Sequence, residues 1–216
     1  FGGIGQNFVN PALAGRIVLL TSFPVAMSTW TQPLTWTMSK LDGITSASPL
    51  SSIHEMASGG AAPDVSLVEM LIGWRAGCLG ETCAVALILG GIYLVVRKVI
   101  SPTIPLTYIG TVAVIMLIAG KGDFRFVAYE LLGGGLMLGA IFMATDYVTT
   151  PNTFWGNVLY FAMLGLLTAG LRLAAEIETV SFSILIMNII CPLIDRYIVP
   201  RPFGKRRERK AKEAKA

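Results

Sequence analysis

The sequence is poor in the side chains that most enzymes use for acid–base, nucleophilic or metal chemistry. Its 216 residues include one histidine, His54, and three cysteines, Cys78, Cys83 and Cys191, with no Cys-x-x-Cys pair. No stretch resembles a Ser-His-Asp triad, a zinc site or a phosphate-binding glycine loop between a strand and a helix. The sequence therefore disfavours hydrolase, nucleotide-dependent ATPase and metal-site functions, and the cysteines are expected to be small buried apolar residues.

Charged residues are scarce as well. They make up 14% of the chain, whereas a soluble domain carries about a quarter. Hydrophobic residues reach 54% and the mean hydropathy is +0.67, which predicts an integral membrane protein. The basic residues gather in the tail 201–216. We expect this tail to lie at an anionic cytoplasmic leaflet rather than to bind nucleic acid.

Long apolar stretches are abundant, and they predict a polytopic all-α helix bundle over residues 1–200. A bilayer core of about 30 Å requires roughly 20 apolar residues per helix. Six candidate elements lie at about 12–30, 68–97, 104–119, 127–145, 154–171 and 180–198. The second is too long for one helix, so we expect a half-helix or re-entrant piece over Leu67–Gly80 and a full span over Thr82–Val96.

Basic residues indicate an orientation. With the tail inside and each element crossing once, Arg97 and Lys98 fall on the cytoplasmic side, as the positive-inside rule prefers. The loop 31–67 then lies outside the cytoplasm. Lys121, Arg125 and Arg172 fall on the disfavoured outer side.

Two pairs of similar stretches suggest an internal pseudo-repeat, which in transporters often surrounds a midplane site. Gly5-Gln6-Asn7 is echoed by Gly80-Glu81-Thr82, and Asn10-Pro11-Ala12-Leu13 by Asn188 with Pro192-Leu193.

Arg75 and Glu81 are the ionisable residues expected at membrane depth. Burial of such groups is costly, so they are candidates for an ion path. The alternative is a structural ion pair that holds a broken helix together. Glu130 and Asp146 are expected at the membrane interfaces. Gly133 to Gly139 is expected to permit close helix packing, with contact to a flat cofactor as the alternative.

The polar stretch Asp42 to Leu50 has hydroxyls at Thr45, Ser46 and Ser48, with Ala47 before Ser48. By itself this stretch predicts a solvated turn. It also resembles the Asp-x-x-(Ser/Thr)-x-Ala-(Ser/Thr) site at which flavin transferases attach FMN through a phosphoester.

Several stretches along nearly the whole chain resemble the RnfD family, which are membrane components of the ion-pumping ferredoxin:NAD oxidoreductase called the Rnf complex. They are Phe1 to Gly5, Asn10-Pro11-Ala12, Ser22-Phe23-Pro24, Asp42 to Leu50, Gly77 to Thr82, Ile109-Gly110-Thr111, Met143 to Asp146 with Thr150-Pro151, and Met187-Asn188 to Asp195. The ending Pro200 to Gly204 favours RnfD over the related NqrB component of the sodium-pumping NADH:quinone reductase.

The resemblance implies an electron-transfer subunit of the bacterial inner membrane that carries covalent FMN on Ser48, where most members have Thr. Thr45 is the substitute acceptor, and Asp42 and Ala47 complete the attachment motif. The resemblance also implies a flavin transferase, partner subunits of the complex, and riboflavin or a second flavin held noncovalently. Members have further helices upstream, so we expect this sequence, which opens at Phe1, to begin within a longer protein.

Two other functions fit the same broken helices and glycines. One is a substrate transporter without a redox cofactor, and the other is a structural scaffold for redox partners. The sequence leaves open whether the coupled ion is Na⁺ or H⁺.

Overall fold

The computed structural model describes residues 9–31, 45–46, 52–53, 65–78, 80–174 and 179–198. This part of the chain is a helix bundle, which confirms the predicted fold class. Its helices are α1 (Pro11–Ser22), α2 (Pro24–Ser28), α4 (Leu67–Ile72), α5 (Ala84–Val96), α6 (Thr103–Ala119), α7 (Phe124–Leu132), α8 (Leu136–Leu138), the π-helix η2 (Gly139–Met143), α9 (Phe154–Ala174) and α10 (Thr179–Tyr197). Strands β1 (Trp30–Thr31) and β2 (Thr45–Ser46) form one short antiparallel pair.

Each of the six apolar stretches predicted from the sequence contains one or more of these helices. Among the described residues, α9 and α10 are long and apolar enough to cross a membrane alone. The helices α7 and α8–η2 form a third candidate span, bent by 65° at a break. The full span expected over Thr82–Val96 is wrong in length, because α5 has 13 residues and reaches only about 20 Å. The chain is thus a multi-pass membrane protein with interrupted helices.

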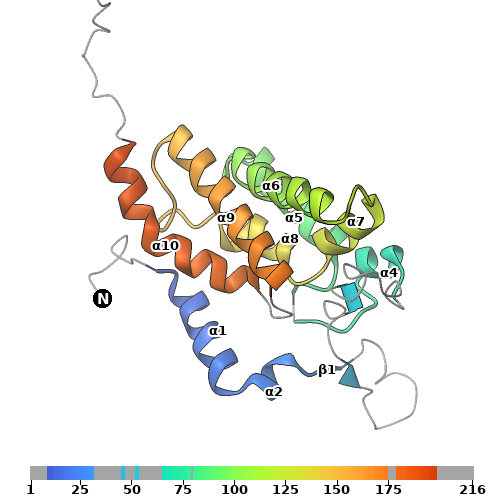
Figure 1. The fold of residues 1–216 in the computed structure, drawn as a ribbon. Helices are drawn as coiled ribbons and strands as arrows, with labels where there is room; N and C mark the ends of the chain where they lie inside the picture. The colour runs from blue at the N-terminus through green and yellow to red at the C-terminus, as the bar shows by residue number, and fades with distance from the viewer. Residues whose placement is uncertain are drawn as a thin grey trace, which may run out of the picture.

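The core forms where α9 packs between α6 and α10 (Figure 1). A Cβ on Gly165 of α9 would lie 2.7 Å from Thr111 Cβ, so this glycine is what allows α6 and α9 to approach. Tyr108 of α6 is fully buried and its hydroxyl lies 2.8 Å from Thr168 Oγ1 on α9. Gly139 has the same role toward α10, because a Cβ there would clash with Val180 Cγ1. The packing role predicted for Gly139 is confirmed.

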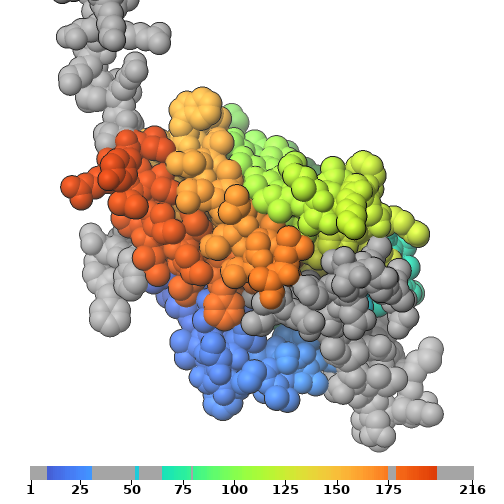
Figure 2. Space-filling model, in the orientation of Figure 1, coloured from blue at the N-terminus to red at the C-terminus, as the bar shows by residue number. Residues whose placement is uncertain are grey.

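The N-terminal helices α1 and α2 lie along the lower edge of the view, and α1 packs against α10 (Figure 2). Asn10 begins α1 by accepting hydrogen bonds from the Ala12 and Leu13 amides, at 3.0 and 3.4 Å. Leu13 is the one side chain of α1 that is buried. After α2, the backbone of Trp30 pairs with that of Ser46. This pairing ties the segment before Ala47 to the end of α2.

Candidate functional site

The first helix break lies between α4 and α5 and is closed by an arginine. Helix α4 begins with a capping box between Ser66 and Glu69 and ends at Gly73, whose φ of 102° is left-handed. Beyond it, Arg75 is 4% exposed and donates hydrogen bonds to the carbonyls of Glu81 and Thr82, at 3.0 and 3.4 Å. A buried guanidinium therefore satisfies carbonyls that the broken helix leaves open.

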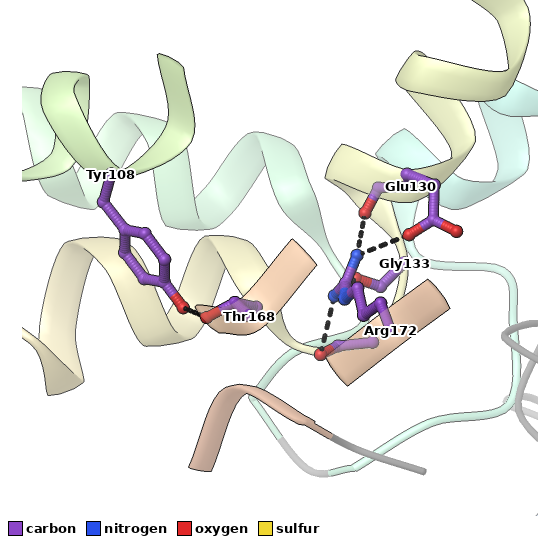
Figure 3. Close-up of polar contacts among 6 residues, drawn as sticks. Tyr108, Glu130, Gly133, Thr168 and Arg172 are labelled. Carbon is purple, nitrogen blue, oxygen red and sulfur yellow. Dashed lines mark hydrogen bonds and ion pairs between the residues drawn. The ribbon is translucent and has the colours of Figure 1, made fainter. Parts of the chain in front are cut away.

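The second break lies between α7 and α8 and is closed in the same manner from another helix. Gly134 and Gly135 have φ of 58° and 66°, which side-chain-bearing residues rarely adopt. Arg172 of α9 donates to the carbonyls of Gly133 and Gly134, at 3.0 and 3.3 Å (Figure 3). It also forms an ion pair with Glu130 at 2.8 Å.

Both residues of this pair are buried within the protein, Glu130 and Arg172 each at 4% exposed. The interface position expected for Glu130 and the outer side expected for Arg172 stay predictions. Isolated buried charges are unstable, and each of these two neutralises the other. The pairing joins residues 42 positions apart and depends on the packing of α7 near α9. No local sequence pattern therefore predicts it.

Glu81 connects the two breaks. Its Oε1 accepts a hydrogen bond from the Cys78 amide at 3.2 Å, within the first break. Its Oε2 faces the second break, since a Cβ on Gly135 would lie 2.6 Å from this atom. The carboxylate is 4% exposed. Arg75 and Glu81, the two candidate residues from the sequence, therefore meet, but through the Glu81 backbone carbonyl as well as through their charges.

A small cavity of about 10 Å³ adjoins the Glu81 carboxylate, which is room for about one water molecule. It lies where α1, both breaks, η2 and the start of α10 converge, and its lining consists of Arg16, Glu81, Gly134, Gly135, Met143, Val180 and Ser181. Among the described residues, three arginines and two glutamates surround the cavity and the breaks.

A second buried polar group joins α1, α9 and α10. Asn188 is 1% exposed and lies 2.9 Å from the Tyr160 hydroxyl. With its amide oxygen turned toward α1, it accepts from the Asn10 amide at 3.2 Å. Pro192, four residues later, has no N–H and leaves the Asn188 carbonyl without its helical partner. The two Asn–Pro stretches noted in the sequence therefore come together, although the pseudo-repeat stays a prediction.

The proposed flavin-attachment residues fall largely outside the described part of the chain. Asp42, Ala47 and Ser48 are not among the described residues, nor is the tail 201–216. The backbone of Thr45 is described, and it pairs with Thr31 in the β1–β2 ladder. Asp146, the other residue expected at an interface, is half-buried and accepts a hydrogen bond from the Val148 amide at 3.3 Å.

Comparison with known proteins gives consistent matches along the chain. The NQR2, RnfD, RnfE family matches residues 1–204. A subunit of the Na(+)-translocating ferredoxin:NAD(+) oxidoreductase complex of Acetobacterium woodii is 42% identical over 100% of this chain and 64% of its own length. The proton-translocating counterpart of Clostridium ljungdahlii is 40% identical over 95% of this chain and 64% of its length. A subunit of the ion-translocating oxidoreductase complex of Alcanivorax borkumensis is 35% identical over 94% of this chain and 65% of its length. The chain thus spans slightly less than two thirds of these relatives.

Proposed function

Because this chain belongs to the NQR2, RnfD, RnfE family, we propose that it is a membrane subunit of an ion-translocating ferredoxin:NAD oxidoreductase. Relatives at 40% and 42% identity are named as subunits of such complexes, and the helix bundle suits a subunit embedded in a bilayer. The other subunits of that complex are its proposed partners. The NqrB component of a sodium-pumping NADH:quinone reductase is the alternative, since the family includes that relative.

The single observation that carries an ion-translocating role is the position of Glu81. Its carboxylate is buried between two helix breaks and adjoins a cavity for one small occupant. A carboxylate held at membrane depth is costly, and such groups mark ion and proton paths. We assign Glu81 as the group that exchanges the transported ion, and Arg75 as the residue that holds its loop.

The arginines around Glu81 control when this carboxylate exchanges the transported ion. Arg75 and Arg172 donate to carbonyls of the two breaks, and Arg16 lines the cavity beside Glu81. Movement of one break relative to the other alters the distance between Glu81 and these guanidinium groups. Electron transfer that drives such a movement would couple redox chemistry to uptake and release of the ion.

The redox cofactor belongs to the second part of the proposal. FMN bound through a phosphoester to the Ser48 hydroxyl supplies one- and two-electron transfer, while the chain supplies the tether. Asp42, Thr45 and Ala47 form the motif read by a flavin transferase. The β1–β2 pair supports this arrangement, because it anchors Ser46, two residues before Ser48, to Trp30. A tethered flavin has a high effective concentration at the next redox centre and is retained outside the cytoplasm.

In-gel flavin fluorescence tests the cofactor assignment on full-length protein coexpressed with a flavin transferase. A fluorescent band that survives SDS in the wild type and in Thr45→Ala, and disappears in Ser48→Ala, supports attachment at Ser48. A dark wild-type band would mean that the protein carries no covalent flavin. The substrate-transporter alternative would then be favoured. Fluorescence that persists in Ser48→Ala but not in Thr45→Ala transfers the attachment to Thr45.

A further inference from the structure

A groove of about 330 Å³ runs along the outside of the bundle between α5, α6 and η2. Its lining is entirely apolar and includes Ile88, Ile92 and Val96 of α5, Leu106 and Ile109 of α6, and Ile141 of η2. Small-molecule sites contain a few polar groups that orient the ligand, and this groove offers none. Its lining therefore matches an unbranched hydrocarbon chain rather than a substrate or a flavin.

The groove has a direction. From Ile88 to Val96 it follows α5 for about 12 Å, and it ends at the loop that joins α5 to α6. Leu106 is 70% exposed on the α6 side of this groove. An occupant can therefore enter from the lipid side and extend one end toward the loop.

Two basic residues stand at that end. Arg97 and Lys98 follow the last groove residue of α5, and both are exposed. The helix ends in a Schellman arrangement in which the Val99 amide donates to the Leu94 carbonyl at 2.9 Å. Lys98 occupies the left-handed position, with φ of 56°, where glycine is the usual residue. The chain thus holds a lysine, at a conformational cost, where an apolar groove meets the loop.

Asp146, an acidic residue beside this loop, is already engaged in hydrogen bonds of its own turn. The Tyr147 hydroxyl donates to the Val99 carbonyl, which places the 146–149 turn beside this loop. Within that turn the Asp146 carboxylate accepts from the Val148 amide and the Thr149 hydroxyl, at 3.3 and 3.4 Å.

We propose that this groove and its two basic residues form a binding site for an acidic phospholipid. One acyl chain lies along the apolar groove between α5 and α6, and the phosphate lies at Arg97 and Lys98. Charge complementarity selects an anionic headgroup, since basic residues at a bilayer surface attract such lipids. The proposal concerns a face remote in sequence from the flavin motif and does not depend on the redox assignment.

Photo-crosslinking tests the site on the full-length protein in its assembled complex. The probe is phosphatidylglycerol with a diazirine in one acyl chain, and labelled peptides are mapped by mass spectrometry. We expect label on peptides that cover residues 88–109, and we expect unlabelled phosphatidylglycerol to compete while phosphatidylcholine at the same concentration does not. Arg97→Gln and Lys98→Gln should each reduce labelling about fivefold.

The chain offers matched controls. Lys121 ends α6 with the same left-handed geometry, at φ of 52°, but at the opposite end of that helix from the groove, so Lys121→Gln should leave labelling unchanged. Leu106→Trp fills the groove and should abolish most labelling. Val114→Trp lies on an exposed part of the same helix outside the groove and should not.

Three results overturn the proposal. Equal competition by phosphatidylcholine would mean that the site does not select an anionic headgroup. Uniform label along the lipid-facing helices, with no effect of Leu106→Trp, means that the groove holds no lipid of its own. Crosslinks from the groove to a neighbouring subunit in place of the probe assign this face to a protein contact.

Discussion

Glu81 and Gly135 lie so close that a Cβ on the glycine would stand 2.6 Å from the glutamate Oε2. They belong to different interrupted helices, and their contact makes two breaks into one structural unit. Two properties of Gly135 allow this contact. Its φ of 66° is left-handed, and its lack of a side chain leaves room for the Glu81 carboxylate.

Gly135→Ala should destabilise the protein by about 2 kcal/mol, because alanine meets both the left-handed backbone penalty and the Glu81 carboxylate. Gly110→Ala is the matched control. Among the described residues, nothing beyond the neighbouring backbone of α6 lies within 4 Å of a Cβ at Gly110, so this change should be neutral or stabilising by up to about 1 kcal/mol. Thermal unfolding of the two purified variants in one detergent measures the contrast. Equal unfolding temperatures would contradict the tight contact.

Arg172→Met should cost about 3–5 kcal/mol, because it leaves Glu130 buried without its ion-pair partner and two carbonyls of the second break without a donor. The double variant Arg172→Met with Glu130→Met removes both charges together. We expect it to recover much of that loss, although the open carbonyls remain. A double-mutant cycle on folded yield and thermal stability gives the coupling, and purely additive effects would show that the pair is not formed.

Asn188→Leu should release α1 from α10, because the Asn10 amide loses its acceptor. Hydrogen exchange is then expected to increase over 10–22 while α9 keeps its protection. Ser183→Ala is the control on the same helix, since the Ser183 hydroxyl donates to the Thr179 carbonyl within α10. Unchanged exchange in α1 for Asn188→Leu would mean that Leu13 packing alone holds this helix.

Hydrophobic length was sufficient to predict where the helices lie, but only one of the two breaks. The half-helix expected over Leu67–Gly80 is present as α4, which ends earlier, at Gly73. The break between α7 and α8 was not predicted, because the apolar stretch 127–145 continues through Gly133 to Gly135. The apolar run of α5 is short: Arg97 and Lys98 follow Val96 directly, and α5 has 13 residues, fewer than the roughly 20 that a bilayer core requires. Composition could not reveal the Glu130–Arg172 pair, which exists only once α9 has packed near α7. The flavin motif stays a prediction, since Ser48 lies outside the described residues.

Ion transport by the assembled complex in sealed vesicles tests whether Glu81 lies on the ion path. Glu81→Gln preserves the acceptor for the Cys78 amide but removes the charge, and Glu69→Gln is its control, because Glu69 caps α4 and glutamine retains the capping box. We predict that Glu81→Gln assembles and transfers electrons from ferredoxin to NAD, while ions moved per electron fall at least about tenfold, the effect of roughly 1.4 kcal/mol. Glu69→Gln should match the wild type in both measures. Unaltered pumping by Glu81→Gln, with normal assembly, would contradict the assignment of Glu81 to the ion path.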